Sequence, residues 1–356
     1  MRLLFSVVLL SAAAFAQQAA PEIPFEASVN FLKLPADMNF GEVAGVAVNS
    51  KGHVFAFSRG NTTGPAYGAT AAQLLEFGPD GRFIREIGKN LYAWSYAHAV
   101  RCDKDDNIWV IDKGSDMIVR FNPEGHVTMV FGRKKEASDE AAPWTRVNPP
   151  RPAVDGQFRQ PTDVTWDTQG NIFISDGYIN SRVAKYDKNG RWVKQWGDRG
   201  SKPGEFNTPH SIAADAKGNI YVADRENSRI QVFDHDGKFL KIIKIDIPAP
   251  AGARVWYGNA FTPENPPQGS RRPGSPWAIC ITPGPGTQYL YSADSYPGRV
   301  YKLSLDGQVL GMFGSTGRQV KQFGWIHEMA CPAENELYVA EILNWRVQKL
   351  LLHPRK

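Results

Sequence analysis

The sequence predicts an all-β protein built as a single six-bladed β-propeller, and three observations support this fold class. Aromatic residues, glycine and proline are abundant, and no long stretch has the period of an amphipathic helix. A unit of about 45 residues, the length of a four-stranded propeller blade, recurs along the chain. The last unit is one strand short, and the N-terminal region holds a strand that belongs to no unit of its own.

Each repeated unit is marked by turn sequences. The first two strands of a unit are joined at Lys51-Gly52, Asp106-Asn107, Gly170-Asn171, Gly218-Asn219 and Glu334-Asn335. A second turn ends in glycine at Gly81, Gly125, Gly190, Gly237 and Gly307. Runs of about five residues separate these turns, so each unit predicts four short antiparallel strands.

The two ends of the chain are expected to meet in one blade. The sixth unit starts at His327 and ends at Leu352, which leaves it one strand short. Near the N-terminus, residues 25–32 read as a strand without a blade. We therefore expect this strand to complete blade six and close the ring. Without it, the edge of blade six would stay unpaired.

The first sixteen residues predict a cleaved secretory signal peptide. A basic start at Arg2 is followed by an apolar run, and Ala14-Phe15-Ala16 supplies a site with small residues for cleavage. The apolar run is shorter than the roughly 20 residues that cross a bilayer, so no membrane span is expected. We accordingly assign residues 1–16 to the signal peptide and 17–356 to the propeller, and expect a secreted or periplasmic protein.

The charge pattern does not favour a nucleic-acid partner. Lysine and arginine number 41 against 36 acidic residues, which gives a formal net charge of +5. The basic residues are interspersed with acidic ones along the chain and form no stripe. A mildly basic surface is the better interpretation.

The three cysteines are expected to be buried small side chains rather than a disulfide framework. Cys102, Cys280 and Cys331 each lie within an apolar run typical of a strand. An odd number in an exported protein requires at least one free thiol or a bond to another chain.

Long connections are expected to gather on one face of the ring. Because neighbouring strands are antiparallel, the start of strand one and the end of strand two lie on the same face. The connections at 60–72, 133–158 and 248–276 all emerge there. Long loops on one face of a propeller are typical of a binding site.

Three histidines occupy the same place in three units. His98, His210 and His327 each stand fourteen residues before the acidic end of strand two, on blades two, four and six. Alternate blades of a six-bladed ring are related by about 120°, so the three imidazoles should converge around the central channel. Three histidines with an open fourth position suit zinc. The alternative is that each histidine only forms a hydrogen bond with a neighbouring blade.

Three further side chains are expected near these histidines. Arg59, Tyr178 and Arg225 follow the ends of the second strands of blades one, three and four by one or two residues. Unlike the arginines of Asn180-Ser181-Arg182 and Asn227-Ser228-Arg229, they do not recur from repeat to repeat. Their spacing therefore favours a functional role over a structural one.

The chain becomes recognisable at a set of segments, which are 45–48, 58–60, 88–91, 160–164, 175–182, 195–197, Pro209-His210-Ser211 and 223–231. These segments closely resemble the peptidyl-α-hydroxyglycine α-amidating lyase (peptidylamidoglycolate lyase), the second catalytic domain of peptide-amidating enzymes. The similarity covers nearly all of the predicted propeller and is more specific than a generic NHL-type repeat.

The resemblance implies a six-bladed NHL-type propeller with zinc on His98, His210 and His327. It further implies that Tyr178 is the base acting on the substrate hydroxyl, with Arg59 and Arg225 beside it. Zinc lowers the pKa of a bound hydroxyl, and arginine can hold a carboxylate bidentately.

The resemblance also implies a structural calcium ion in the channel. Its ligands would be the main-chain oxygens of Val46 and Val100 and the acidic residue after the third histidine. That residue is Glu328 here, where the family has aspartate. Oxygen ligands of this kind suit calcium.

The implied activity is cleavage of a peptidyl- or acyl-α-hydroxyglycine to an amide and glyoxylate. The partner would be a small-molecule or peptide substrate with an α-hydroxyglycine end. No copper monooxygenase domain precedes the predicted propeller in these 356 residues, so a separate monooxygenase would supply the substrate. The alternatives are a non-catalytic NHL-repeat binding protein and another metal-dependent propeller hydrolase.

Overall fold

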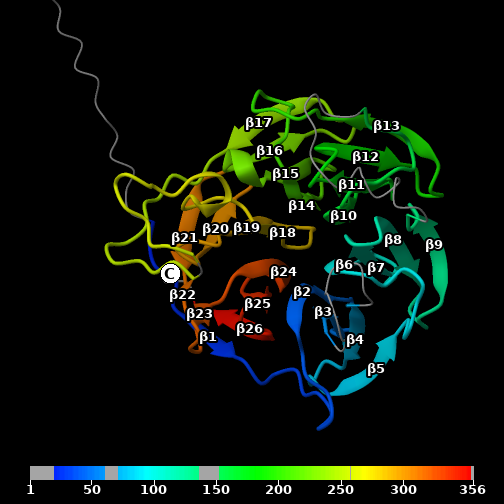
Figure 1. Cartoon of the computed structure of the whole chain (residues 1–356), viewed down its shortest axis with the longest axis horizontal. Helices are drawn as coiled ribbons and strands as arrows, with labels where there is room; N and C mark the ends of the chain where they lie inside the picture. The colour runs from blue at the N-terminus through cyan, green and yellow to red at the C-terminus, as the bar shows by residue number, and fades with distance from the viewer. Residues whose placement is uncertain (1–19, 61–70, 136–151, 257, 354–356) are drawn as a thin grey trace, which may run out of the picture.

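A computed structural model of the chain describes residues 20–60, 71–135, 152–256 and 258–353. The described residues form six four-stranded antiparallel sheets arranged in a ring around a central axis, as predicted (Figure 1). The predicted signal peptide at 1–16 lies outside the described residues, as do parts of the three long connections. No helix in the described ranges is long and apolar enough to cross a membrane.

The blades follow one another in chain order, and in blades one to five the strands are numbered outward from the axis. Blade one contains β2 (Glu42–Val48), β3 (Val54–Arg59), β4 (Gln73–Phe77) and β5 (Phe83–Ile87). Blade two contains β6 (Ala97–Cys102), β7 (Ile108–Asp112), β8 (Met117–Phe121) and β9 (Val127–Phe131). Blade three contains β10 (Asp163–Trp166), β11 (Ile172–Asp176), β12 (Arg182–Tyr186) and β13 (Trp192–Trp196).

The second half of the ring repeats this order and adds small extra elements. Blade four contains β14 (Pro209–Ala214), β15 (Ile220–Asp224), β16 (Arg229–Phe233) and β17 (Phe239–Ile243). Blade five contains β18 (Ala278–Ile281), β19 (Tyr289–Ala293), β20 (Val300–Ser304) and β21 (Val309–Phe313). Blade six contains β24 (Ile326–Ala333), β25 (Glu336–Glu341), β26 (Arg346–Leu352) and β1 (Phe25–Ser28). The extra elements are the short β22 (Ser315–Thr316) and β23 (Gln322–Phe323) and the 3₁₀ turns η2 (Arg225–Asn227) and η3 (Gly269–Arg271).

Blade six is closed by the N-terminal strand, which confirms the prediction. β1 pairs antiparallel with β26, in a register that sets Phe25 opposite Leu352 and Ser28 opposite Lys349. The ring of Phe25 also lies 4.8 Å from that of Phe313 in blade five. The N-terminal strand β1 is therefore the outermost strand of blade six, and it also packs against blade five.

Local side-chain chemistry explains the tight turns. In blade four, Asp215 Oδ1 accepts the backbone N–H groups of Lys217 and Asn219, each at 2.9 Å. Gly218 between them has a φ of +82°, which glycine adopts without strain. Blade three repeats the arrangement with Asp167, which accepts the N–H of Asn171 at 2.9 Å. The recurring sequence pattern is thus a recurring aspartate-capped turn.

The recurring arginines have a structural role. The carboxylate that ends strand two is buried in blades three, four and six and pairs with an arginine at the start of strand three of the same blade. The pairs are Asp176–Arg182, Asp224–Arg229 and Glu341–Arg346. Each arginine also donates to main-chain carbonyls of the connection before its blade. These networks hold the connections against the blades.

The interpretation of the cysteines was wrong for two of the three. Cys280 on β18 and Cys331 on β24 form a disulfide between blades five and six. The inner strands of adjacent blades bring the two Cα atoms to 6.1 Å, within the range that a disulfide spans. Cys102, at the end of β6, is free.

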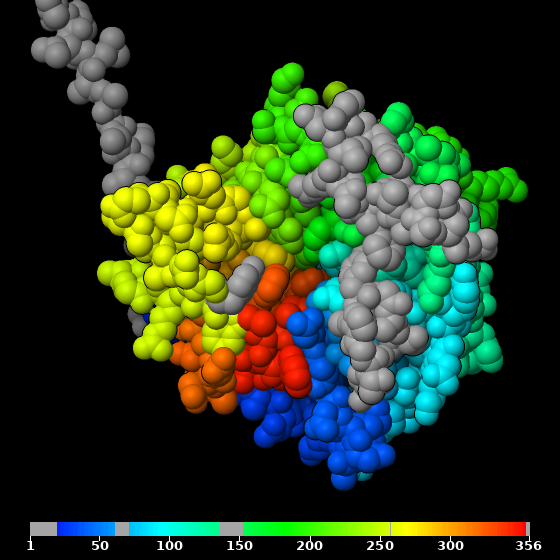
Figure 2. Space-filling model, in the orientation of Figure 1, coloured from blue at the N-terminus to red at the C-terminus, as the bar shows by residue number. Residues whose placement is uncertain are grey.

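One long connection lies on the predicted face. Ser270, in the segment between β17 and β18, donates its N–H to Glu226 Oε2 at 2.9 Å, directly after the end of β15. Ser228 donates its hydroxyl to Gly269 O at 3.0 Å. In Figure 2 this segment, in yellow, covers the outer side of blade five.

Candidate active site

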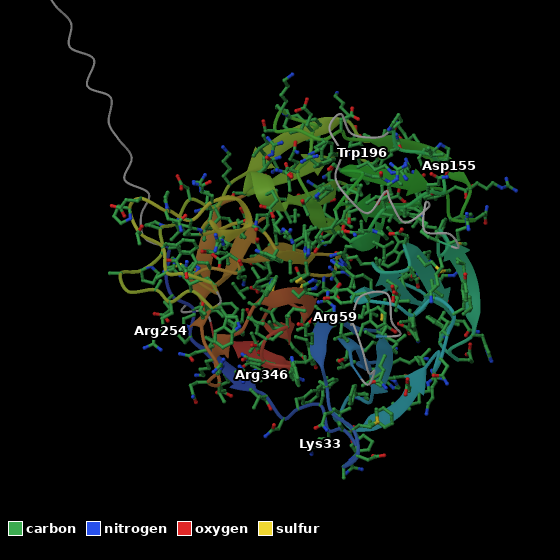
Figure 3. The ribbon with its side chains drawn as sticks, in the orientation of Figure 1. Lys33, Arg59, Asp155, Trp196, Arg254 and Arg346 are labelled. Carbon is green, nitrogen blue, oxygen red and sulfur yellow. A yellow bond between two sulfur atoms is a disulfide. The ribbon has the colours of Figure 1, made fainter. Side chains whose placement is uncertain are left out.

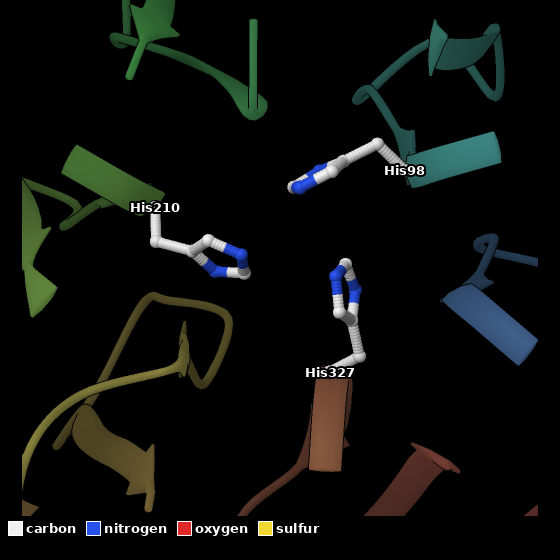
Figure 4. A group of neighbouring side chains, drawn as sticks. All are labelled: His98, His210 and His327. Carbon is white, nitrogen blue, oxygen red and sulfur yellow. The ribbon is translucent and has the colours of Figure 1, made fainter. Parts of the chain in front are cut away.

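Three histidines converge on the axis, as their spacing predicted (Figure 4). His98, His210 and His327 come from β6, β14 and β24, and all three are buried. Their ring centroids are 4.7 to 5.0 Å apart, and one ring nitrogen of each lies within 4.8 Å of the other two. This is the arrangement of a three-nitrogen metal site.

A β-bulge aims each histidine at the axis. The register between the first and second strands shifts between Ala97 and Ala99, between Pro209 and Ser211, and between Ile326 and Glu328. The histidine is the extra residue in each case, and a bulge is a common way to re-aim a side chain. Blade one has the same shift at Ala44, whereas the inner strands of blades three and five begin one residue after Thr162 and Trp277 and show no shift.

The neighbouring blades fix the orientation of each imidazole. The Nδ1 atoms of His98, His210 and His327 each lie 2.7 Å from a main-chain oxygen, of Thr162, Trp277 and Ala44 respectively. A carbonyl oxygen can only accept a hydrogen bond, so Nδ1 carries the proton and Nε2 keeps its lone pair. The alternative, in which each histidine forms a hydrogen bond with a neighbouring blade, is therefore also true. The same hydrogen bonds orient Nε2 as a metal ligand.

The three imidazoles are neutral, as metal ligands must be. Burial is the main cause that lowers the pKa of each histidine well below its usual value. Repulsion from the other histidines and from nearby cations lowers the pKa of His98 and His210 further. Three neutral imidazoles with their lone pairs on one small region fit zinc, for which an open fourth position is typical of catalytic sites.

Tyr178 lies at the mouth of this site. It follows β11 by two residues, and its N–H donates to Gln160 O at 3.3 Å. Its phenolic oxygen is 3.0 Å from Nε2 of His210 and 3.3 Å from Nε2 of His98. The phenol thus contacts directly two of the Nε2 atoms that the hydrogen bonds from Nδ1 leave available.

Both predicted arginines lie beside Tyr178 and are held on aromatic rings. Arg59, labelled near the middle of the ring in Figure 3, stacks 3.9 Å from the centroid of Tyr96. Its Nε donates to Ala97 O at 2.8 Å. Arg225 lies 4.1 Å from the centroid of Trp277 and 5.4 Å from that of Tyr178.

Each arginine also pairs with a carboxylate. Arg59 Nη1 donates to Glu42 Oε2 at 2.8 Å, and Arg225 Nη2 donates to Glu226 Oε1 at 3.0 Å. Each guanidinium group stacks on an aromatic ring and pairs with a carboxylate at one edge, which leaves it little rotational freedom. Both guanidinium groups are therefore held in position above the histidines.

Sequence reasoning missed a third cation, Lys113. Its Nζ lies 3.6 Å from the ring centroid of Tyr178 and 5.9 Å from that of Tyr96. Lys113 directly follows Asp112, as Arg59 follows Ser58 and Arg225 follows Asp224. A search for basic residues at this one offset would have found it.

The cations shift the acidity of Tyr178. Burial raises the pKa of Tyr178, but Lys113, Arg225 and Arg59 together lower it by more. Its pKa consequently lies below the usual value for a phenol. The three positive side chains also make the mouth attractive to an anion such as a substrate carboxylate.

Glu328 contacts Val46 and Val100, but through their N–H groups, and this arrangement does not fit calcium. Oε2 of Glu328 accepts the backbone N–H groups of Val46 at 2.9 Å and Val100 at 3.1 Å. Oε1 of the same carboxylate lies 3.0 Å from Nε of Arg101. A calcium ion bound to Glu328 would lie beside a buried guanidinium of the same charge sign, which is unfavourable at low dielectric.

Comparisons with known proteins support the predicted relationship. A model of the NHL repeat matches residues 206–233, in blade four. Peptidylglycine alpha-amidating monooxygenase of Rattus norvegicus is 32% identical over 229 residues, which cover 57% of this chain and 22% of that protein. Peptidyl-alpha-hydroxyglycine alpha-amidating lyase 1 of Drosophila melanogaster is 25% identical over 344 residues, which cover 88% of this chain and 58% of that protein. The chain thus spans less than two thirds of each relative's length.

Solved structures show the same architecture. A gluconolactonase from Xanthomonas campestris superposes with a TM-score of 0.57, covering 94% of this chain and 95% of that one. Its sequence identity is 14%, so the likeness shows the fold alone. The sequence relatives are more specific, and they confirm the resemblance seen in the motifs: this chain is similar to the peptidyl-α-hydroxyglycine α-amidating lyases over most of its length.

Proposed function

We propose that this protein is a zinc-dependent lyase that cleaves a peptidyl- or acyl-α-hydroxyglycine to the amide and glyoxylate. The observation that carries the proposal is one constellation: three inward-facing histidines, the hydroxyl of Tyr178 3.0 Å from Nε2 of His210, and basic side chains around that phenol. The similarity to a Drosophila protein named as such a lyase supports the assignment.

The reaction requires one proton to move and one bond to break. The substrate R–CO–NH–CH(OH)–COO⁻ loses its hydroxyl proton, the C–O bond becomes the carbonyl of glyoxylate, and the C–N bond breaks. The amide nitrogen takes up a proton, so the atoms and charges balance. No oxidant or reductant is involved.

Each residue has a role that follows from its position. Tyr178 takes the hydroxyl proton and can return it to the leaving nitrogen, because its lowered pKa makes both states accessible. Arg225 and Lys113 lie 5.4 Å and 3.6 Å from the centroid of its ring and offer positive charge to the substrate carboxylate. Zinc on His98, His210 and His327 would lower the pKa of the substrate hydroxyl.

The setting of the reaction belongs to the same proposal. We infer a secreted or periplasmic protein, and the Cys280–Cys331 disulfide supports an oxidising compartment. The substrate would come from a separate monooxygenase, since an α-hydroxyglycine end requires prior oxygenation of a glycine-extended molecule.

The test is glyoxylate release from α-hydroxyhippurate by the zinc-loaded protein. Tyr178→Phe should lower kcat by about 10²- to 10⁴-fold, the range typical of lost acid–base catalysis. Its zinc content should stay unchanged. Tyr186→Phe is the matched control, because its hydroxyl lies away from the axis near Asp155 and should leave the rate unaltered.

Two outcomes would contradict the proposal. One is a zinc-loaded wild-type protein that releases no glyoxylate above the buffer rate from either α-hydroxyhippurate or a peptide with the same end. Zinc-loaded protein without activity would favour the non-catalytic binding protein or another metal-dependent hydrolase. The other is a Tyr178→Phe variant with wild-type kcat, which would remove Tyr178 from the chemistry.

A further inference from the structure

One charged side chain lies among small ones below the histidines. Arg101 stands three residues after His98 on the inner strand of blade two. The same place on the other five blades carries only small side chains, all buried: Ala47, Thr165, Ala213, Cys280 and Ala330. Five small residues leave room at the axis for one long side chain, and Arg101 extends into this space.

The guanidinium of Arg101 contacts four other blades. It binds Asp163 on blade three bidentately, with Nε 2.9 Å from Oδ1 and Nη2 2.6 Å from Oδ2. On blade six, Nη1 donates to Met329 O at 2.9 Å. Weaker contacts reach Ser211 Oγ on blade four at 3.3 Å and Ile279 O on blade five at 3.4 Å.

The two neighbouring carboxylates extend this network to the whole ring. Asp163 Oδ2 accepts the hydroxyl of Ser211 at 2.8 Å and the N–H of Ile212 at 3.1 Å. Glu328 accepts the N–H of Val46 on blade one and lies 3.0 Å from Nε of Arg101. Inner strands of all six blades are therefore joined through one cation and two carboxylates.

The cluster holds one cation, the guanidinium of Arg101. Burial lowers the pKa of Arg101, but the carboxylates of Asp163 and Glu328 raise it by more, so the guanidinium stays charged. The Nε–H group of Arg101 donates to Asp163. Oε1 of Glu328 lies within ion-pair distance of Arg101 but accepts no aligned hydrogen bond. The single guanidinium is thus shared between two buried acids.

We propose that Arg101 is a built-in cation that takes the place of a structural calcium ion, so that the axis of this propeller is closed without that metal. Arginine supplies the positive charge that the carboxylates need and hydrogen bonds to main-chain oxygens that would otherwise face a metal ion. It also repels any second cation from the same small space.

The wild-type protein gives the first test. Zinc-loaded protein is dialysed against millimolar calcium chloride in chelator-free buffer with zinc held constant, and bound calcium and the unfolding temperature are measured. We expect no stoichiometric calcium and no change of Tm beyond about 1 °C, because a ligand that does not bind the folded state does not stabilise it. One calcium per chain, or a clear rise in Tm, would overturn the proposal.

Variants of Arg101 give the second test. Arg101→Ala leaves two acids without their cation, and Tm should fall by about 5–10 °C. Millimolar calcium should restore part of this loss, since the emptied space is lined by carboxylate and carbonyl oxygens. Arg101→Lys keeps the charge and should remain insensitive to calcium. An Arg101→Ala variant with wild-type Tm would contradict the proposal.

If Arg101→Ala does not fold, Arg101→Lys and the wild-type measurement still decide the question. Arg120→Ala is the matched control, because that arginine lies on the exposed side of blade two and bonds Thr128. Its Tm should be close to that of the wild type, with or without calcium.

Discussion

Two layers of the central channel are built in opposite ways. In the upper layer, blades two, four and six each contribute a histidine, a bulge and a bond to the next blade's carbonyl. In the lower layer, one long side chain from blade two reaches partners on four other blades. The upper layer uses the repeat, whereas the lower layer departs from it.

The difference separates chemistry from stability. In each histidine, Nδ1 forms a hydrogen bond with the neighbouring blade, and Nε2 is available to a ligand at the mouth. In the lower layer, the polar atoms of Arg101 and Asp163 form hydrogen bonds with each other and with neighbouring strands. Changes in the upper layer should therefore remove metal and activity, and changes in the lower layer should weaken the fold.

The largest effect is expected for His210→Ala. Losing one of three metal ligands should reduce bound zinc from about one per chain to near zero. Activity should fall by more than the 10- to 100-fold typical of mutations around a metal's ligands. Elemental analysis and the glyoxylate assay check both. His235→Ala, an exposed histidine beside Asp236, is the control, and wild-type zinc in His210→Ala would contradict the three-histidine site.

A smaller effect, of the opposite kind, is expected for Asp163→Asn. The change keeps the shape but leaves Arg101 without its bidentate partner, and breaking a buried ion pair costs about 3–5 kcal/mol. The free energy of unfolding in urea should fall accordingly, while zinc content stays near one per chain. Asp306→Asn, a fully exposed acid paired loosely with Lys241, should change stability little. Equal stability of Asp163→Asn and wild type would mean that the lower layer does not hold the ring.

The sequence predicted the upper layer because repetition made it visible. A fourteen-residue interval on alternate blades was enough to place three imidazoles together, and a missing strand was enough to predict the pairing of β1 with β26. Lys113 was overlooked, although it stands at the same offset as Arg59 and Arg225.

The lower layer could not be predicted in the same way. Arg101 is a single charged residue in an apolar strand, and its partners on other blades follow no shared spacing. The Cys280–Cys331 disulfide was missed for a related reason. The two residues do not stand at the same offset in their repeats, and only the packing of adjacent inner strands shows that they meet.

The smallest predicted effect concerns Arg225, above the histidine layer. A charge-assisted hydrogen bond contributes about 1.5–3 kcal/mol, so Arg225→Ala should raise KM for α-hydroxyhippurate by about 10- to 100-fold. If Arg225 holds the carboxylate equally in the ground and transition states, kcat should change much less. Arg225→Lys separates charge from shape, because lysine keeps the charge but cannot bind two oxygens in a fork. A lysine variant with intermediate KM would support bidentate binding. An alanine variant that loses kcat while keeping KM would instead place Arg225 in transition-state stabilisation, through its effect on Tyr178, whose ring centroid lies 5.4 Å from the guanidinium.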